Sequence, residues 1–389
     1  MNITPEIITE PDYSLDKKHP WSLPRLVLNY LSILEEHPAL FLDRVFKAGK
    51  LELVALSGNE PLALMIVTEL QKKIDLLMRQ ETPESPTTRF ADGEVRPVFD
   101  PKTVLRGKHV IILQSFSPAW KSGDSSINDQ VVELILACQQ AKAASASEIT
   151  VVMPYLAYAR SDKKDMPKGG IAIKAILTAI EAQGVTRFVS IDLHKDQIAG
   201  FAQIFDVLYS SEIFIPRIKQ LLAGRSAVFV CADPGAIHMV QAYSARTLGH
   251  KTVGVVSKSR DPETGMSRTD NYSGPDLTGK IVIFVDDLIG SASTAVEAAN
   301  LIATKGVTRD DVGTPEIYFV ASHGLFVKNA LSLIKDSAIK QVWTTNTISH
   351  QPEVYDQTAT GGKIVVFNIA AFLAEKILNV HTGRPMGID

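Results

Sequence analysis

The chain has 389 residues, 45% of them hydrophobic and 21% charged, which is typical of a globular protein with about two domains. Its 40 basic and 43 acidic residues give a net charge of -3, so the charge balance indicates neither a nucleic-acid partner nor a membrane-surface partner. The N-terminal sequence lacks a secretory signal pattern and no apolar run reaches the ~20 residues of a membrane helix, so we expect a cytoplasmic protein.

Residues 1–50 differ from the rest of the chain. The stretch Trp21–Lys47 has apolar residues at helical spacing, with a break at Pro38, and we expect a helical segment there. The residues before it lack such a pattern, which favours a mobile arm. We therefore expect an N-terminal helical extension ahead of the main fold.

From residue 51 onward, short apolar runs alternate with amphipathic stretches. The expected strands are Leu51–Leu56, His109–Leu113, Ile149–Met153, Phe188–Ile191, Ala227–Val230, Thr252–Val256, Ile281–Val285, Ile317–Val320, Gln341–Thr345 and Lys363–Phe367. The expected helices include Asn128–Ala144, Gly170–Ala182, Gly235–Leu248 and Thr294–Thr304. Continuous apolar strands suit parallel sheets covered on both faces, so the pattern predicts α/β architecture.

Roughly ten strands exceed the usual size of one sheet, so we expect two α/β domains. The least structured break lies near Ala202–Val207, which places the domains at residues 51–205 and 206–350. Residues 351–389 add a strand and a helix that we expect to pack back on the first domain. The polar stretch Lys258–Lys280 lies between two strands, and a loop of this length suggests a lid or binding loop.

Polar residues follow several expected strands at the edge where open α/β sheets bind ligands. They are Asp192-Leu193-His194, Asp233-Pro234-Gly235, Asp286-Asp287 and Ser322-His323-Gly324. One such ending alone is as well explained by a helix N-cap. Several together predict a charged cleft, and carboxylates with histidine favour a hard cation such as Mg²⁺. The widely separated Cys138 and Cys231 predict plain buried thiols and no cysteine metal site.

The stretch Ile281–Ala299 combines a buried strand, two aspartates, a turn of small residues and a helix. A helix start offers free backbone N–H groups to a phosphate, and Ser291, Ser293 and Thr294 add hydroxyl donors. Asp286 and Asp287 would repel that phosphate and suit sugar hydroxyls or a metal instead. The stretch by itself is equally consistent with a sugar-phosphate site and with an ordinary capped turn.

Eight motifs follow one another along the chain: "SGN" at Ser57, "RFADGEV" at Arg89, "MPYLAYARSDKKD" at Met153, "DLHKDQIAGF" at Asp192, "KSR" at Lys258, "VDDLIGSAST" at Val285, "SHGLF" at Ser322 and "TNTI" at Thr345. With these motifs in register, the chain resembles the phosphoribosyl diphosphate (PRPP) synthetases, or ribose-phosphate pyrophosphokinases, from about Leu53 to His381. The resemblance implies two phosphoribosyltransferase-like, Rossmann-like domains with mainly parallel sheets. It also implies Mg²⁺-dependent transfer of the β,γ-diphosphoryl group of ATP to the C1 hydroxyl of ribose 5-phosphate.

The resemblance also assigns roles to residues. It implies ATP binding by Phe90, Asp92, Glu94, Arg160, Ser161 and His194, with the segment around Phe90 supplied by a neighbouring subunit. It implies Mg²⁺-linked positions at His194 and Asp233, and catalytic lid cations at Lys258 and Arg260. It implies ribose 5-phosphate binding by Asp286, Asp287, Gly290, Ser291, Ala292, Ser293 and Thr294. A shared adenine site implies a homo-oligomer built from dimers, up to a hexamer, with no nucleic-acid or membrane partner.

The chain departs from the family pattern in its phosphate loops. Gly290 replaces an aspartate, and Ala292 and Ser293 replace glycines, which disfavours positive φ. The turn Asp233–Met239 has lost its basic residues except His238. These departures keep alternatives open: a non-catalytic regulatory homologue, a synthetase with an altered substrate, and a phosphoribosyltransferase that consumes PRPP. Retention of Lys258, Arg260 and both aspartates favours an active synthetase.

Overall fold

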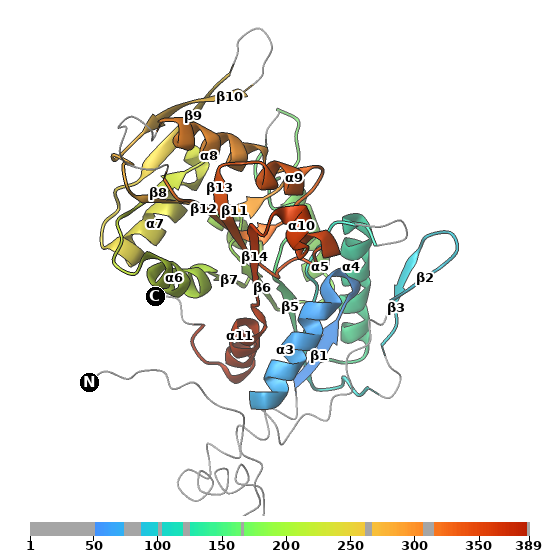
Figure 1. Cartoon of the computed structure of the whole chain (residues 1–389). Helices are drawn as coiled ribbons and strands as arrows, with labels where there is room; N and C mark the ends of the chain where they lie inside the picture. The colour runs from blue at the N-terminus through green and yellow to red at the C-terminus, as the bar shows by residue number, and fades with distance from the viewer. Residues whose placement is uncertain are drawn as a thin grey trace, which may run out of the picture.

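A computed structural model describes residues 51–73, 87–99, 103–119, 125–164, 167–260, 267–305 and 315–386. The expected helix Trp21–Lys47 and the arm before it lie outside the described residues. Two sheets, each with helices on both faces, form the body of the molecule (Figure 1). The expected α/β architecture with mainly parallel sheets is therefore confirmed.

The first sheet has five parallel strands in the order β1-β4-β5-β6-β7. Their bounds are β1 Leu51–Ala55, β4 His109–Leu113, β5 Glu148–Met153, β6 Arg187–Ile191 and β7 Phe205–Leu208. Helices α4 (Ile127–Ala143) and α5 (Ala172–Glu181) share a core with one face, and α3 (Glu60–Lys73) and α11 (Ala370–Thr382) share one with the other. Burial on both faces explains why β4 is apolar at nearly every position.

The second sheet has seven strands in the order β10-β9-β8-β11-β12-β13-β14, parallel except for the β9–β10 pair. Their bounds are β8 Ala227–Cys231, β9 Gly254–Arg260, β10 Ser267–Ser273, β11 Ile281–Ile289, β12 Ile317–Gly324, β13 Ile339–Thr345 and β14 Ile364–Phe367. One face packs on α8 (Ser293–Lys305) and α9 (Ala330–Lys335), the other on α6 (Ser211–Leu222) and α7 (Ile237–Leu248).

Three sequence expectations need correction. β7 occupies the region of the expected break near Ala202–Val207 and is the edge strand of the first sheet, because the short run of Phe205–Leu208 pairs with β6. The stretch Lys258–Lys280 is not a structureless loop, since β9 continues to Arg260 and β10 pairs with it antiparallel. Both β11 and β12 run four residues past their expected ends, so Asp286 and Asp287 lie within β11.

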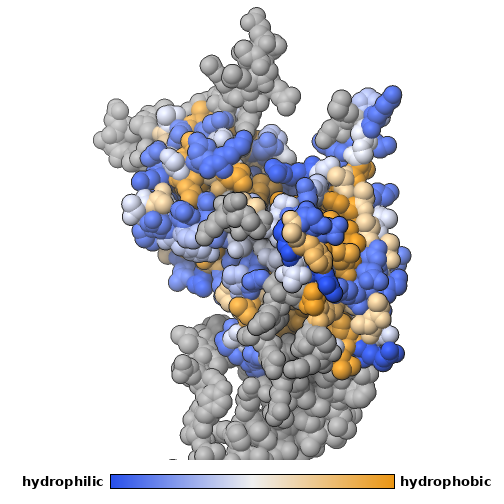
Figure 2. Space-filling model, turned by 90° about the vertical axis from the view of Figure 1, so that its right-hand side faces the viewer, coloured by the Kyte–Doolittle hydropathy of each residue, from blue (hydrophilic) through white to orange (hydrophobic). Residues whose placement is uncertain are grey.

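The C-terminal residues link the two halves of the molecule. Strand β14 pairs with β13 in the second sheet, whereas the buried residues of α11 belong to the core cluster of β1 and α3. On the first half, α4 buries one face in the core but leaves Val132 and Leu136 47% and 38% exposed. Figure 2 shows this side of the molecule, with apolar patches among the hydrophilic surface. Part of the apolar surface of the single chain is thus uncovered.

Candidate active site

The carboxyl ends of the two sheets meet at a contact between His194, which follows β6, and Asp287, which lies on β11. Nδ1 of His194 is 2.8 Å from Oδ2 of Asp287. The two residues line a small pocket together with Tyr155, Arg160, Asp192 and His323. The pocket therefore joins Arg160 and His194, predicted to bind ATP, to Asp287, predicted to bind ribose 5-phosphate.

The adjacent carboxyl groups of Asp286 and Asp287 have opposite pKa shifts. Burial raises the pKa of Asp287, but the hydrogen bond and charge of His194 outweigh it, so the net shift is downward. Burial and the neighbouring charge of Asp287 raise the pKa of Asp286 well above its ordinary value. The two shifts favour the carboxylate form of Asp287 and make Asp286 the more readily protonated of the pair.

Behind the pocket, buried polar side chains fasten β6 to β12. Asp192, 5% exposed, accepts hydrogen bonds from the hydroxyl of Ser322 and from the backbone N–H of Ser210, 3.2 Å away. Burial nevertheless raises the pKa of Asp192. Nε2 of His323 lies 3.0 Å from the Ile191 carbonyl and Nδ1 lies 3.0 Å from Thr347 Oγ1. Burial lowers the pKa of His323, so its imidazole is neutral. This neutral side chain stabilises the contact between the two sheets.

The expected phosphate loop, Gly290–Thr294, leads from β11 into α8. Ala292 has φ +64° and is 3% exposed, and its carbonyl accepts the 2.9 Å hydrogen bond from Val296 that opens α8. The loop therefore keeps a left-handed residue although alanine stands where the family has glycine, at a cost of about 1–2 kcal/mol. The hydroxyl oxygens of Ser291 and Ser293 lie 3.2 Å apart, beside the first turn of α8.

The turn after β8 lies near the same junction of the two sheets but does not provide a complete set of metal ligands. Oδ1 of Asp233 accepts a 2.8 Å hydrogen bond from the N–H of Gly235, and Lys195 donates to the Gly235 carbonyl at 3.1 Å. Among the residues that the structure describes, no group of three or more histidine, cysteine, aspartate or glutamate side chains is placed to hold a metal ion. A metal ion at this turn would need ligands beyond these side chains, such as water or the oxygens of a bound molecule.

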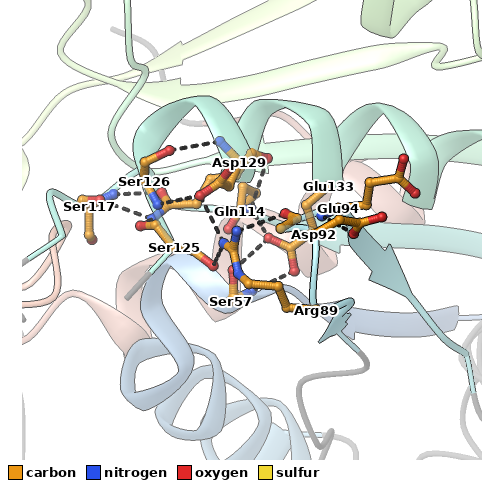
Figure 3. A network of polar contacts seen from close by, with 12 residues as sticks. Ser57, Arg89, Asp92, Glu94, Gln114, Ser117, Ser125, Ser126, Asp129 and Glu133 are labelled. Carbon is orange, nitrogen blue, oxygen red and sulfur yellow. Dashed lines mark hydrogen bonds and ion pairs between the residues drawn. The ribbon is translucent and has the colours of Figure 1, made fainter. Parts of the chain in front are cut away.

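The predicted adenine-binding residues lie on a separate hairpin formed by β2 (Thr87–Arg89) and β3 (Val95–Pro97). Phe90, Asp92 and Glu94 are exposed at its turn, Phe90 by 48%. No hydrogen bond or ion pair found in the described part of the chain links these three side chains to the pocket. Arg89 fastens the hairpin to α4 through Asp129, 2.8 Å away (Figure 3).

The remaining predicted residues are only partly placed. The N–H of Ser161 donates to the Tyr158 carbonyl, and the Ser161 hydroxyl oxygen accepts from the N–H of Ala172 at 3.4 Å. Ser161 therefore connects the Arg160 loop to α5. Lys258 and Arg260 lie on β9, where they pair with Thr269 and Ser267 of β10. Their side chains are outside the described part of the structure.

Comparison with known proteins decides the family. Residues 51–184 match the N-terminal domain of ribose phosphate pyrophosphokinase, and residues 271–388 match a phosphoribosyl synthetase-associated domain. The chain is 33% identical over 300 residues to the ribose-phosphate pyrophosphokinase of Aquifex aeolicus, covering 76% of this chain and 87% of that protein. It is 32% identical over 347 residues to ribose-phosphate pyrophosphokinase 1 of Streptococcus agalactiae, covering 87% and 96%. The chain belongs to the ribose-phosphate pyrophosphokinase family of enzymes.

The fold gives the same answer. The crystal structure of phosphoribosylpyrophosphate synthetase from Mycobacterium smegmatis matches with a TM-score of 0.71 and 26% identity, covering 86% of this chain and 99% of that one. The pyrophosphokinase family predicted from the sequence is thereby confirmed. No helix among the described residues is long and apolar enough to cross a membrane. That the protein acts in the cytoplasm stays a prediction from the sequence.

Sequence reasoning placed Asp192 and His323 at strand ends in the expected cleft but gave them no role, and it did not single out Lys195 for the candidate site. Asp192, Tyr155 and His323 line the pocket, and Lys195 reaches the Asp233–Gly235 turn from the other half of the molecule. Asp192 and Lys195 lie within the motif at Asp192, and Ser322-His323 within the motif at Ser322. Their positions at the ends of strands were therefore a signal visible in the sequence. Their contacts with the other half of the molecule were not visible there.

Proposed function

We propose that the protein transfers the β,γ-diphosphoryl group of ATP to the C1 hydroxyl of ribose 5-phosphate, giving PRPP and AMP. The observation that carries this proposal is the contact between His194 and Asp287 in a pocket that also contains Arg160. Each half of the molecule thus supplies side chains to one pocket. A reaction that transfers a group from a nucleotide to a sugar phosphate needs both substrates in one shared site.

On the sugar side, Asp287 is an ionised acceptor suited to ribose hydroxyls. Asp286, whose pKa is raised, would be available as a hydrogen-bond donor or, when ionised, as a second acceptor. The amides at the start of α8, with the hydroxyls of Ser291, Ser293 and Thr294, suit the 5-phosphate. Gly290 and Ala292 complete this loop through their backbone.

On the nucleotide side, we assign Arg160, Ser161 and His194 to the phosphates and ribose of ATP. Phe90 would stack on adenine, and Asp92 or Glu94 would accept from its amino group. Because these three residues lie on an exposed hairpin, we assign them to the site of a neighbouring subunit. The exposed Val132 and Leu136 on α4 support an oligomer, which we propose to be built from dimers, up to a hexamer.

The transfer forms a bond from the C1 oxygen to the β-phosphorus and breaks the bond from that phosphorus to the departing AMP oxygen. Lys258 and Arg260 would stabilise the charge on the transferred group and on AMP. We assign His194 and Asp233 to hold Mg²⁺, which when bound with substrate phosphates would neutralise part of their charge. The carboxylate, imidazole and phosphate oxygens present in such a complex suit this ion.

The test is an incubation of the purified full-length protein with ATP, Mg²⁺ and ribose 5-phosphate, followed by quantification of AMP and PRPP. We expect both products to form. Absence of AMP across a range of phosphate and metal concentrations would contradict the proposal. If the protein is inactive alone but changes the rate of an added active synthetase, the regulatory alternative is correct.

A further inference from the structure

Glu133 on α4 is a buried carboxylate whose role the reaction above does not explain. It is 1% exposed, yet it accepts hydrogen bonds from three directions (Figure 3). Ser57 donates through its N–H at 3.2 Å and its hydroxyl at 2.5 Å, and Gln114 donates through Nε2 at 2.9 Å. The hydroxyl of Thr87, at the start of the hairpin, donates to Oε1 of Glu133, the oxygen that also accepts the Ser57 N–H.

A second contact joins the same hairpin to the same helix. Arg89 donates to Asp129 at 2.8 Å, and Asp129 also forms the capping box of α4 with Ser126. Thr87 and Arg89 are two residues apart on a strand, and Asp129 and Glu133 are four residues apart on a helix. Each pair therefore lies on one face of its element, and the two faces meet. Two contacts fix both the position and the direction of strand β2, which one contact could not do.

The strand held in this way leads directly into the turn that carries Phe90, Asp92 and Glu94. We propose that Glu133, with Asp129, is a positioning residue that fixes the orientation of the β2–β3 hairpin for adenine binding. This inference rests on the proposed function for the role of the hairpin, but the contacts that carry it are independent of the reaction. Neither carboxylate touches ATP in this account, because both act through Thr87 and Arg89.

Helix α4 also contacts the other predicted ATP segment. The hydroxyl of Tyr158, two residues before Arg160, donates to the side-chain oxygen of Asn128 in the first turn of α4. The hairpin and the Arg160 loop are thus both fastened to the N-terminal half of one helix. A change in how the hairpin is held is therefore expected to affect ATP and to leave ribose 5-phosphate, bound at the other sheet, unaffected.

A purely structural role for Glu133 is the alternative, since its bonds to Ser57 and Gln114 hold the first domain together. The hydrogen bond from Thr87 distinguishes the positioning role of Glu133 from the purely structural role, because in the described part of the chain it alone connects Glu133 to the hairpin. Thr87→Val removes the hydroxyl donor, keeps the side-chain shape and leaves the Ser57 and Gln114 contacts in place. Thr88→Val is a matched control, because among the described residues the Thr88 hydroxyl donates to the Arg96 carbonyl within the hairpin, at 3.3 Å, and not to α4.

The experiment measures steady-state kinetics for both substrates, the Kd for ATP by calorimetry, and amide exchange of residues 87–97 in the full-length protein. For Thr87→Val we expect KM and Kd for ATP to rise about tenfold, equivalent to about 1.4 kcal/mol. The KM for ribose 5-phosphate and the melting temperature should stay unchanged, and the hairpin amides should exchange faster. Thr87→Ser, which keeps the hydroxyl, should restore the wild-type values, and Thr88→Val should match wild type.

Equal effects of Thr87→Val and Thr88→Val would overturn the inference, as would equal changes in KM for both substrates. If the wild-type protein binds ATP but forms no PRPP, the proposed reaction fails while the Kd and exchange comparisons still decide the role of Glu133. A wild-type protein that binds no ATP contradicts both. Glu133→Gln, which keeps one acceptor oxygen, is expected to show the Thr87→Val phenotype together with a lower melting temperature.

Discussion

Nδ1 of His194 and Oδ2 of Asp287 lie 2.8 Å apart, although His194 follows a strand of the first sheet, Asp287 lies in the second, and the two are 93 positions apart in the chain. The contact holds the pKa of Asp287 below its ordinary value despite burial. In the proposed reaction one partner serves ATP and the other serves ribose 5-phosphate. The side chains that we assign to the two substrates are therefore hydrogen-bonded to each other in the absence of either substrate.

Replacement of either partner is expected to disturb both halves of the site. We expect His194→Asn and Asp287→Asn each to lower kcat/KM by roughly 100-fold, because charge and position are lost together. The double variant should fall well short of the product of the two losses, since the residues act as a unit. A double-mutant cycle on kcat/KM for ribose 5-phosphate measures this. Strictly multiplicative losses would show that the contact carries no coupling.

Lys258 on β9 is predicted to act on the transferred group. We expect Lys258→Ala to lower kcat by about 100-fold or more, the usual effect of removing one charge-stabilising group, with little change in KM or melting temperature. Lys251→Ala is the control, since Lys251 is exposed just before the same strand. Unchanged turnover in Lys258→Ala would remove this residue from the mechanism.

Because Ala292 has a left-handed backbone, we predict that a smaller and a larger residue at this position change the free energy of unfolding by different amounts. Ala292→Gly relieves about 1–2 kcal/mol of backbone strain but loses about 0.8 kcal/mol of methyl burial and about 0.4–1 kcal/mol through the more flexible unfolded chain. The free energy of unfolding should therefore change by under about 1 kcal/mol, whereas branched Ala292→Val should lose more than about 2 kcal/mol. Denaturant unfolding checks both variants. Similar stabilities for the two would contradict the left-handed backbone.

The buried His109, at the start of β4, predicts that the folded protein loses stability in acid. Burial, then the charges of His381 and Arg187, lower its pKa from 6.5 to about 4. The unfolded chain therefore takes up the proton first, and the free energy of unfolding should fall by about 3 kcal/mol between pH 6.5 and 4, at about 1.4 kcal/mol per pKa unit. Unfolding titrations across this range should give a shallower fall for His109→Gln. The same slope in both proteins would rule out this assignment.

The sequence predicted the strands that contain an apolar run and missed the short or polar strands β2, β3, β7 and β10. His109–Leu113 is apolar throughout and matches β4 as expected. Strand β10, by contrast, reads SRTDNYS, because an edge strand paired only with β9 needs no apolar pattern. The polar hairpin strands β2 and β3 were missed for the same reason. Asp286 was expected beyond its strand, since nothing local marks where pairing with β12 stops.

Which residues belong to the candidate site was easier to predict than which of them contact each other. Asp287 and His194 were both identified from motifs, but their pairing depends on how two sheets pack, which no local pattern specifies. Glu133 was missed although a signal existed, because an acidic residue among the apolar positions of VVELIL is unusual on a core-facing helix. Ala292 was expected to disfavour positive φ, and the structure keeps that backbone at an energetic cost instead.

Phosphorus NMR of one sample containing the wild-type protein, ATP, Mg²⁺ and ribose 5-phosphate tests the central claim most directly. The account predicts that AMP and a diphosphate ester at the C1 position of ribose 5-phosphate appear in equal amounts as ATP disappears, without ADP. Formation of ADP, which would report transfer of a single phosphoryl group, or persistence of both substrates would contradict it.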